Sequence, residues 1–566
     1  MKIYYGVDFK EQRQKLLKSP KALPLIKEVI INADKAINEE YQIDKITEYM
    51  AYFETGVRND GEIFKRRTNC SNLAIALWLT EDKKYIKPLL DHIFYICNEF
   101  TWCVPAHSGM IGGKEVKVER LIRNIELNMA ETAMLLTDVA VLTGEQLPYY
   151  AVERIEYELR RRIFDAYKTY DCFEAAECQN NNWATVCACG CGIALLHFGT
   201  KEEIEQLLPR LIGGMDRYLK GVNEDGCCLE GPHYWGYGFG HYLLFARALY
   251  DYSNGEINYL HNEKVRKLSL YLQRVRISDT KVVSFSDGES KFAFSPGLLS
   301  FLKTLNKNVC LPELKYARCF GGDCSVKDFL WFDTEYEADE QEYTTTFFEK
   351  SEWYIRKCEK YSFAAKGGHN YEPHNHNDIG SFMITVNEDM PIADFGRPQY
   401  IIYLDNDDRF KESGFLNFSS RGHSLPIIDG KYQCLGAEYK AKNVYGEDTE
   451  FSLDIEGAYE EGLVNKIHRR FSFKENGVIL KDTFVYSEKT KNIVERFTSW
   501  TKPQVYEGKV SLGNLYIAFD REKYTVNILE DSYPAHREPH EPVGVYFIDF
   551  IPCNPVQTEF EFEFVV

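Results

Sequence analysis

The sequence predicts an α+β protein of two domains, with helical hairpins first and antiparallel β structure second. The chain has 566 residues and 44% hydrophobic content, which is too long for one compact core and apolar enough for two. Apolar residues recur at helical spacing from about residue 8 to about residue 310, and β-branched and aromatic residues dominate after about residue 340. The acidic stretch 332–340 separates the two regimes, so we expect domains at 1–335 and 336–566.

The first domain reads as a series of amphipathic helices of ordinary length. Turn residues such as Gly199-Thr200 and Ser253-Asn254-Gly255 separate them at short intervals, so neighbouring helices should run antiparallel. The chain shows no fixed-period motif of the kind that marks helical repeat arrays. We therefore expect an incomplete α/α toroid of unlike hairpins. The clearest amphipathic segments are 119–144, 151–170, 202–222 and 261–278.

The second domain reads as antiparallel β structure. Residues 471–487 alternate between apolar and polar types around Asn476-Gly477, which is the strongest short hairpin signal. The segments 510–520, 524–530, 543–551 and 558–566 are rich in β-branched and aromatic residues.

Charge and composition restrict the partners. The formal net charge of −19 argues against a nucleic-acid surface, so an anionic ligand must be held locally. No apolar stretch is long enough to cross a membrane, and the start has no basic and apolar leader pattern, so we expect a cytoplasmic protein; removal of a leader would give the same start. The 16 cysteines form no CxxC pair, and we expect reduced, buried thiols such as Cys187, Cys189 and Cys191.

The densest group of functional side chains lies at 367–382. Three histidines and two carboxylates fall within ten residues: His369, Glu372, His374, His376 and Asp378. In an extended segment, residues two apart face the same way, so His374, His376 and Asp378 could project together. A solvated loop with incidental histidines is the alternative.

Two further residues could complete a metal site with this group. Asp394 lies in IADFG, and His423 lies in SSRGHSLPIIDG. With His376 they would give a nitrogen and oxygen set that suits Zn²⁺ or Mn²⁺, and Ca²⁺ is a further option.

Two clusters stand out in the helical domain. Asn180, Asn181 and Asn182 precede a predicted helix, and capping that helix needs one asparagine, so the others could donate hydrogen bonds outward. The segment 230–242 is too rich in glycine for a regular helix and rich in aromatic residues, so we expect a loop that lines a sugar-binding cleft. Packing of these rings between hairpins is the alternative.

The residues EPHNHNDIGSFMITVNEDMPIADFG (372–396) and RGHSLPIIDGKYQ (421–433) resemble the C-terminal motif block of the heparinase II/III-like polysaccharide lyases. The segments 101–107, 123–133, 180–186 and 230–238 resemble helical-domain blocks of the same family, in the same order. The resemblance implies an incomplete α/α toroid followed by an antiparallel β-sandwich.

The resemblance also implies the reaction. A base removes the C5 proton of a uronic acid, the C4–oxygen bond breaks, and an unsaturated uronide remains. His374 matches the catalytic histidine, Tyr234 or Tyr237 the catalytic tyrosine, and Asn181 or Asn182 the residue that neutralises the substrate carboxylate. His376, Asp394 and His423 match positions that hold a divalent ion with a structural role. Substrate-binding candidates are Trp102, His107, Arg123, Glu230, His369 and Arg421.

The expected substrate is an acidic polysaccharide or oligosaccharide. A glycosaminoglycan such as heparan sulfate, chondroitin or hyaluronan is favoured, with alginate as the alternative. Two histidines and a carboxylate also describe the iron site of an oxygenase, and a carbohydrate-binding protein without turnover is another alternative. We expect no nucleic-acid and no membrane partner, and leave a homodimer open.

Overall fold

The computed structural model describes residues 5–40, 46–55, 60–108, 116–317, 325–340, 342–398, 415–534 and 542–566. The chain forms two compact units. The helical unit comprises Met1–Val222, Tyr234–Ser269 and Ala293–Glu340, and the β unit comprises Asn223–His233, Leu270–Phe292 and Gln341–Val566. Two segments from within residues 1–335 therefore fold with the β residues.

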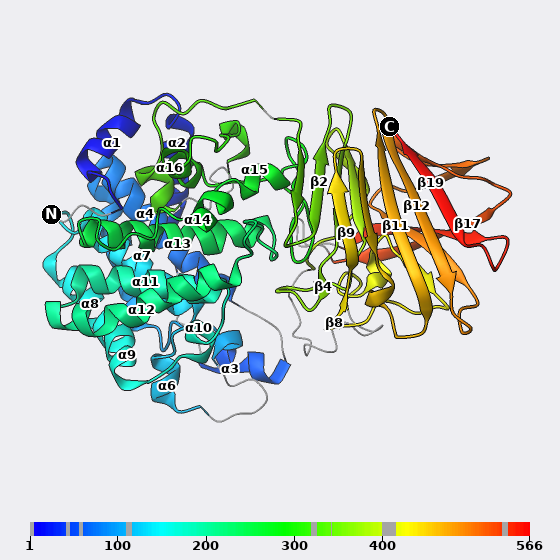
Figure 1. The fold of residues 1–566 in the computed structure, drawn as a ribbon. Coiled ribbons are helices and arrows are strands. Elements are labelled where there is room, and N and C mark those ends of the chain that lie inside the picture. The colour runs from blue at the N-terminus through cyan, green and yellow to red at the C-terminus, as the bar shows by residue number, and fades with distance from the viewer. Residues whose placement is uncertain are drawn as a thin grey trace. The chain divides into compact units, whose positions relative to one another are not determined.

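The helices follow one another through the first 330 residues (Figure 1). They are α1 (Phe9–Lys18), α2 (Leu23–Ala36), α3 (Ile46–Thr55), α4 (Gly61–Thr80), α5 (Ile86–Asn98), α6 (Val118–Ile122), α7 (Leu127–Thr143), α8 (Tyr149–Leu159), α9 (Asp165–Thr169), α10 (Glu174–Glu177), α11 (Asn182–Phe198), α12 (Lys201–Gly221), α13 (Pro232–Tyr252), α14 (Glu263–Leu268), α15 (Tyr271–Val275), α16 (Pro296–Leu305) and α17 (Val326–Leu330).

Helix α11 is the centre of the helical unit. It packs against both α7 and α12. Small residues permit this close packing: a Cβ added at Gly190 would lie 2.0 Å from the Ala130 carbonyl oxygen of α7. Cys187, Cys189 and Cys191 are buried on the same helix, as expected of small packing thiols.

The first and last helices of this unit meet. The Gln12 side chain donates to the carbonyl oxygens of Phe329 and Phe332, both at 2.9 Å. The Trp331 indole donates to the Tyr5 carbonyl oxygen at 3.0 Å. The predicted incomplete α/α toroid is confirmed.

The glycine-rich aromatic segment is a helix, so the predicted loop at 230–242 is wrong. Helix α13 begins at Pro232 and includes the glycines. Its buried rings Trp235, Phe239 and Tyr242 are spaced i, i+4 and i+7, which places them on one helical face. Apolar periodicity and tertiary packing therefore outweigh the low helix propensity of glycine.

The strands are β1 (Thr345–Phe348), β2 (Trp353–Lys357), β3 (Ser362–Lys366), β4 (His369–Asn370), β5 (Phe382–Val386), β6 (Asp389–Ile392), β7 (Pro426–Ile428), β8 (Gly436–Lys440), β9 (Lys442–Glu447), β10 (Glu450–Asp454), β11 (Val464–Lys474), β12 (Gly477–Tyr486), β13 (Ile493–Ser499), β14 (Gln504–Tyr506), β15 (Lys509–Leu512), β16 (Leu515–Ala518), β17 (Tyr524–Tyr533), β18 (Val543–Pro552) and β19 (Glu559–Val565).

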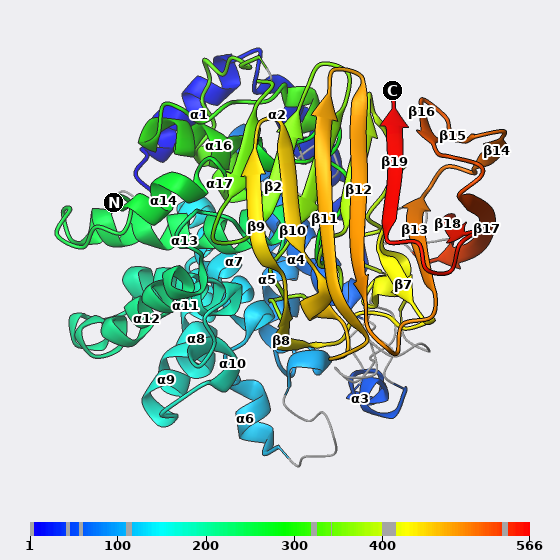
Figure 2. The same ribbon diagram turned by 45° about the vertical axis from the view of Figure 1, so that its right-hand side comes forward.

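These strands form antiparallel sheets. One has the order β1-β2-β3-β5-β6, the largest has the order β14-β15-β16-β19-β12-β11-β10-β9, and a third has the order β17-β18-β13-β7. Figure 2 shows β9 to β12 and β19 as the broad face of the largest sheet. The hairpin predicted at Asn476-Gly477 is β11–β12, with Lys474 opposite Gly477.

The sheets pack face to face through aromatic side chains. The ring centroids of Phe363 on β3 and Phe471 on β11 lie 4.9 Å apart, and those of Phe382 on β5 and Phe564 on β19 lie 5.4 Å apart. The predicted antiparallel β-sandwich is confirmed. In the described part of the chain, no helix combines the length and apolar character that a membrane crossing needs.

Candidate functional site

The histidine-rich segment lies in the β unit between β4 and β5. His374 has φ +55°, a left-handed conformation that is uncommon outside glycine. Its side chain is 34% exposed, whereas His376 is fully buried. The segment is therefore not extended: the prediction that His374 faces the same way as His376 and Asp378 is wrong, whereas His376 and Asp378 do lie in one cluster.

Asp287 joins the two histidines, and the sequence did not reveal it. Its Oδ2 lies 2.6 Å from His374 Nδ1 and its Oδ1 lies 3.2 Å from His376 Nε2. The carboxylate is 1% exposed. Burial disfavours its charge, but the hydrogen bonds to both histidines outweigh burial and hold the pKa of Asp287 well below its usual range. The sequence SFSDGES gives only a turn signal at this position.

Glu230 lies on the other side of His374. Its Oε2 is 3.6 Å from His374 Nε2. Burial raises the pKa of Glu230 above its ordinary value, and His374 offsets part of that shift when its ring is protonated. The structure thus brings the predicted residues Glu230 and His374 together.

His376, Asp394 and His423 are all buried in the β unit, and the ring centroids of the two histidines lie 5.6 Å apart. His423 Nδ1 lies 3.2 Å from Asp394 Oδ2. Among the described residues, His376 Nδ1 has no hydrogen-bond partner, and His423 Nδ1 and Asp394 Oδ2 have only their ion pair with each other. A buried ring nitrogen without a partner, beside a buried imidazole–carboxylate pair, is unusual and fits a site that holds a cation.

The hydrogen bonds of the two imidazoles support the same arrangement. His423 Nε2 lies 2.6 Å from the Asn417 carbonyl oxygen, and His376 Nε2 lies 3.2 Å from Asp287 Oδ1 and 3.1 Å from the Asn417 side-chain amide. With each Nε2 protonated, each Nδ1 keeps a lone pair for a metal, which is the usual support of ligating histidines.

Asp378 is a further carboxylate at this centre. Ligand atoms of His376, Asp378 and His423 lie within 4.8 Å of one another. Asp378 also pairs with the buried Lys366 at 2.8 Å, which already balances its charge. The residues present therefore fit a divalent ion held by two imidazoles and one or both carboxylates.

In the helical unit, Asn181 and Asn182 have different surroundings. Asn181 caps α11, and its side-chain oxygen accepts from the Trp183 backbone N–H at 3.1 Å. Asn182 is 4% exposed and faces α13, where a Cβ added at Gly238 would lie 2.9 Å from its Cβ. The helix cap thus uses the Asn181 oxygen and leaves Asn182 to make other contacts.

His107 lies beside this helix start. Its Nδ1 is 2.7 Å from Glu126 Oε2, and its ring centroid is 4.7 Å from that of Trp183. Glu126 also caps α7 by accepting from the backbone N–H of Met129 at 2.7 Å. Three segments that the sequence singled out, 101–107, 123–133 and 180–186, therefore meet in the helical unit.

Tyr237 belongs to the same surroundings through Glu131. Burial raises the pKa of Glu131 to about 7, and a hydrogen bond to Tyr237 opposes that shift. Tyr234 lies one turn earlier on α13 and is half-buried. Glu131 was not predicted, although it lies in the singled-out segment 123–133.

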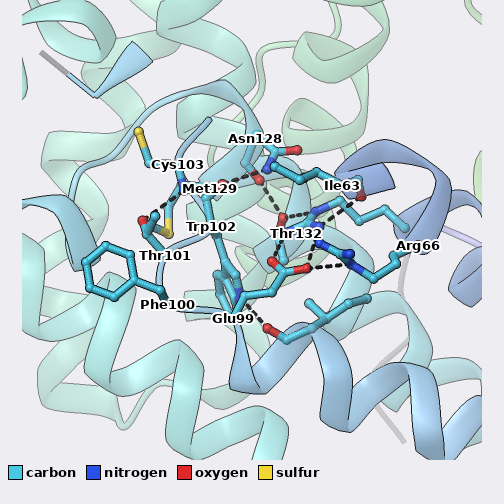
Figure 3. A network of polar contacts seen from close by, with 12 residues as sticks. Ile63, Arg66, Glu99, Phe100, Thr101, Trp102, Cys103, Asn128, Met129 and Thr132 are labelled. Carbon is cyan, nitrogen blue, oxygen red and sulfur yellow. Dashed lines mark hydrogen bonds and ion pairs between the residues drawn. The ribbon is translucent and has the colours of Figure 1, made fainter. Parts of the chain in front are cut away.

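Trp102 is enclosed in the helical core. It is 1% exposed, and its indole donates to the Ile96 carbonyl oxygen at 2.7 Å. The guanidinium of Arg162 lies 4.7 Å from the ring centroid. The Asn128 side chain donates to the Trp102 carbonyl oxygen at 2.6 Å (Figure 3).

The neighbouring Glu99 fastens this segment to α4. Its carboxylate accepts from Arg66 at 3.0 Å and from Arg67 at 2.7 Å. Arg67 also donates to the Thr132 hydroxyl of α7 at 2.7 Å. Figure 3 shows Glu99 facing Arg66 and Thr132 from the segment that leads to Trp102.

The remaining substrate-binding candidates are Arg123, His369 and Arg421, and each makes its own local contacts. Arg123 donates to Glu119 at 2.8 Å and to the Arg161 carbonyl oxygen at 3.0 Å. His369 begins β4, and its Nδ1 accepts from the Tyr371 backbone N–H at 3.2 Å. Arg421 is half-buried in the short helix Ser420–Gly422.

Comparisons with known proteins identify solved structures that share the fold of this chain. No family model matches the sequence, and no curated protein matches it. Among solved structures, a heparinase III has a TM-score of 0.62 and 14% identity, covering 100% of this chain and 86% of that chain. A heparan sulfate lyase mutant from Pedobacter heparinus has a TM-score of 0.59 and 13% identity, covering 95% and 82%.

A chondroitin AC lyase from Streptomyces coelicolor, solved with chondroitin sulphate, has a TM-score of 0.55 and 9% identity, covering 98% of this chain and 82% of that chain. At such identities, structural likeness reports the architecture. The chain has the α/α toroid and antiparallel β-sandwich fold of these polysaccharide lyases.

Proposed function

We propose that the protein is a lyase that cleaves uronic-acid-containing polysaccharides or oligosaccharides by β-elimination. One observation carries the proposal. In a chain with a polysaccharide-lyase fold, His374 is held through Nδ1 by the buried carboxylate of Asp287, on a left-handed backbone. Left-handed conformations of residues other than glycine cluster at functional sites.

His374 is the proposed base. Because Nδ1–H donates a hydrogen bond to Asp287 and keeps its proton, the Nε2 lone pair can take the C5 proton of the uronic acid. The electron pair of the C5–H bond forms the C4=C5 double bond, and the C4–oxygen bond breaks. The departing oxygen leaves as a hydroxyl after it receives a proton.

The helical unit carries groups that suit the other needs of this reaction. Charge develops on the uronic carboxylate as C5 loses its proton, and preorganised amide donors stabilise such charge. Asn181 and Asn182 are the candidates for this role; the cap of α11 uses the Asn181 side-chain oxygen as acceptor and leaves the Asn181 NH2 group to donate. Tyr237 and Tyr234 are the candidate donors of the proton to the departing oxygen.

We propose a divalent ion, Zn²⁺ before Mn²⁺ or Ca²⁺, at His376, His423 and the carboxylates of Asp394 and Asp378. The ion would supply a fixed charge that ties together the loops of the β unit. The residues themselves supply two buried imidazole nitrogens, His376 Nδ1 and His423 Nδ1, and the buried carboxylate oxygen Asp394 Oδ2.

The proposed substrate class is glycosaminoglycan, with alginate as the alternative. The solved lyases of this fold include enzymes whose names specify heparan sulfate and chondroitin. Heparan sulfate, chondroitin sulfate and hyaluronan are therefore the first substrates to test, both as polymers and as oligosaccharides.

The test is ultraviolet absorbance from the unsaturated product, comparing the wild type with His374→Ala and His261→Ala. His261 is an exposed histidine of the helical unit and provides the matched control. Loss of a general base costs about 100-fold or more in rate, so His374→Ala should be nearly inactive while folded, and His261→Ala should match the wild type. Wild-type rates in a folded His374→Ala variant would remove the assignment.

A further inference from the structure

We propose that Asp287 is a positioning residue that sets the tautomers of two histidines in opposite senses. It would hold His374 with its proton on Nδ1 and His376 with its proton on Nε2. One carboxylate would thereby prepare a base and a metal ligand together. The His374 part of this inference rests on the proposed lyase function, and the His376 part does not.

The geometry of the carboxylate supports a double role. Oδ2 lies 2.6 Å from His374 Nδ1, and Oδ1 lies 3.2 Å from His376 Nε2. An ionised carboxylate only accepts hydrogen bonds, so a ring nitrogen that donates to it carries a proton. The Asn417 side-chain amide also lies 3.1 Å from His376 Nε2, and a protonated Nε2 requires this amide to face the ring with its oxygen, which otherwise has no partner among the described residues. The opposite nitrogens, His374 Nε2 and His376 Nδ1, then keep their lone pairs.

The two remaining nitrogens face different surroundings. His374 Nε2 belongs to a ring that is 34% exposed, as a base that meets a substrate requires. His376 Nδ1 is buried without a hydrogen-bond partner among the described residues and belongs to the cluster with His423 and Asp378. The same carboxylate thus prepares one nitrogen for a reactant and one for a cation.

The backbone around Asp287 is built for this placement. Ser286 has φ +58°, and the Gly288 N–H closes the turn on the Phe285 carbonyl oxygen at 3.2 Å. A Cβ added at Gly396 would lie 2.1 Å from the Gly288 carbonyl oxygen. A left-handed serine is strained, so the packing must hold this turn in place.

The turn is also tied to the metal-site segment. The Ser284 hydroxyl donates to the Asp394 carbonyl oxygen at 3.0 Å. The Arg397 backbone N–H donates to the Gly288 carbonyl oxygen at 3.3 Å. These hydrogen bonds hold the turn that carries Asp287 in place next to the segment that carries Asp394.

Asp287→Asn tests the inference because an amide has one acceptor and one donor group. It cannot accept protons from both histidines, so at least one ring must change its tautomer. We expect kcat to fall about 100-fold or more with KM unchanged, or zinc affinity to fall about 10-fold or more, or both. Zinc affinity is measured by competition with a chelator, without substrate.

Asp279→Asn is the matched control. It makes the same change in the same stretch of the β unit, on a carboxylate that is 51% exposed and paired with Arg276. Its kcat and zinc affinity should equal those of the wild type. An Asp287→Asn protein that keeps both wild-type kcat and wild-type zinc affinity would overturn the proposal, and loss of either supports it.

A measurement on the wild type covers the case in which Asp287→Asn does not fold. In zinc-free protein labelled with [¹⁵N]histidine, the neutral His374 ring, assigned with His374→Ala, should carry its proton on Nδ1. A proton on Nε2 would overturn the inference. Because this spectrum and zinc binding need no substrate, they separate failure of Asp287 as a positioning residue from failure of the proposed lyase function.

Discussion

Gly238 shows how one residue controls the surroundings of the candidate amide. A Cβ at this position would lie 2.9 Å from the Asn182 Cβ and 3.1 Å from the Tyr218 ring, whereas a Cβ at Gly236 on the same helix would meet nothing within 4 Å. Gly238 therefore permits the close contact between α13 and α11, and Gly236 has no such role.

We predict that Gly238→Ala lowers the free energy of unfolding by about 1–3 kcal/mol through overpacking. Gly236→Ala should raise it by up to about 1 kcal/mol, because alanine is the better helix former. Denaturant unfolding of both variants measures the contrast. Equal stability of the two would show that the α11–α13 contact is looser than described.

Asp138 gives the helical unit a dependence on pH. Burial raises its pKa to about 7, which the Tyr5 hydroxyl at 2.8 Å partly opposes. The folded state binds the Asp138 proton more tightly than the unfolded state does. The protonated carboxyl therefore stabilises the fold fully below the ordinary pKa of about 4, and this stabilisation is lost as pH rises through about 7.

Asp138→Asn keeps the Tyr5 partner and removes the titration. Relative to the wild type, its free energy of unfolding should therefore increase between pH 4 and pH 8, as followed by chemical denaturation at several pH values. A difference between the two proteins that does not change with pH would contradict the assignment.

Among the individual residues of the site, the sequence predicted His374, His376, Asp394 and His423 but not Asp287. The histidines stand close together in a recognisable pattern, whereas Asp287 lies 87 residues before His374. Its local sequence contains only a turn signal. Contacts between distant segments depend on the tertiary fold, which one sequence does not display.

Among the elements, the hairpin β11–β12 was predictable because Asn476-Gly477 fixes its turn and alternation fixes its faces. Helix α13 was not, because four glycines between 230 and 242 suggested a loop. Gly238 is there for close packing on α11 and Gly231, with φ +97°, for the turn before the helix. Local composition could not distinguish these roles from loop formation.

The ion pairs of Glu99 fasten the segment between α5 and α7 to α4. Its side chain is 8% exposed and faces Arg66 and Arg67, which are also buried. We predict that Glu99→Gln costs about 3–5 kcal/mol of folding stability, because two buried guanidinium groups lose their counter-charge.

The control is Glu81→Gln, which removes an exposed partner of Arg13 on the same helical unit. It should change stability by less than about 1 kcal/mol. Thermal unfolding of both variants measures the difference, and a Glu99→Gln protein as stable as Glu81→Gln would contradict the role of the network.

For the whole molecule, the helix-then-strand order was readable from the sequence, but the composition of the units was not. Asn223–His233 and Leu270–Phe292 belong to the β unit and bring Glu230 and Asp287 to the histidines. Both segments are flanked by residues with helical periodicity, so the sequence did not indicate that they belong to the β unit. Periodicity predicts local structure and not which unit a segment joins.

The two units also lead to a prediction about metal. If unfolding shows two transitions in calorimetry, zinc should raise the one that belongs to the β unit and chelator should lower it, with the helical transition unchanged. A ligand at 100 times its Kd adds about 2.7 kcal/mol. A His376→Ala, His423→Ala variant should lose the response; zinc stabilisation that survives in this variant would place the ion elsewhere.

The measurement that tests the central claim most directly is the appearance of an unsaturated uronide. Wild-type protein and His374→Ala are incubated with heparan sulfate, chondroitin sulfate, hyaluronan, alginate and their oligosaccharides, with and without zinc, and ultraviolet absorbance is followed. If the protein is the proposed lyase, absorbance rises with the wild type on at least one uronide and does not rise with folded His374→Ala. A wild type that produces no unsaturated product from any of them, or a His374→Ala variant that produces it at the wild-type rate, would rule out the proposed lyase mechanism.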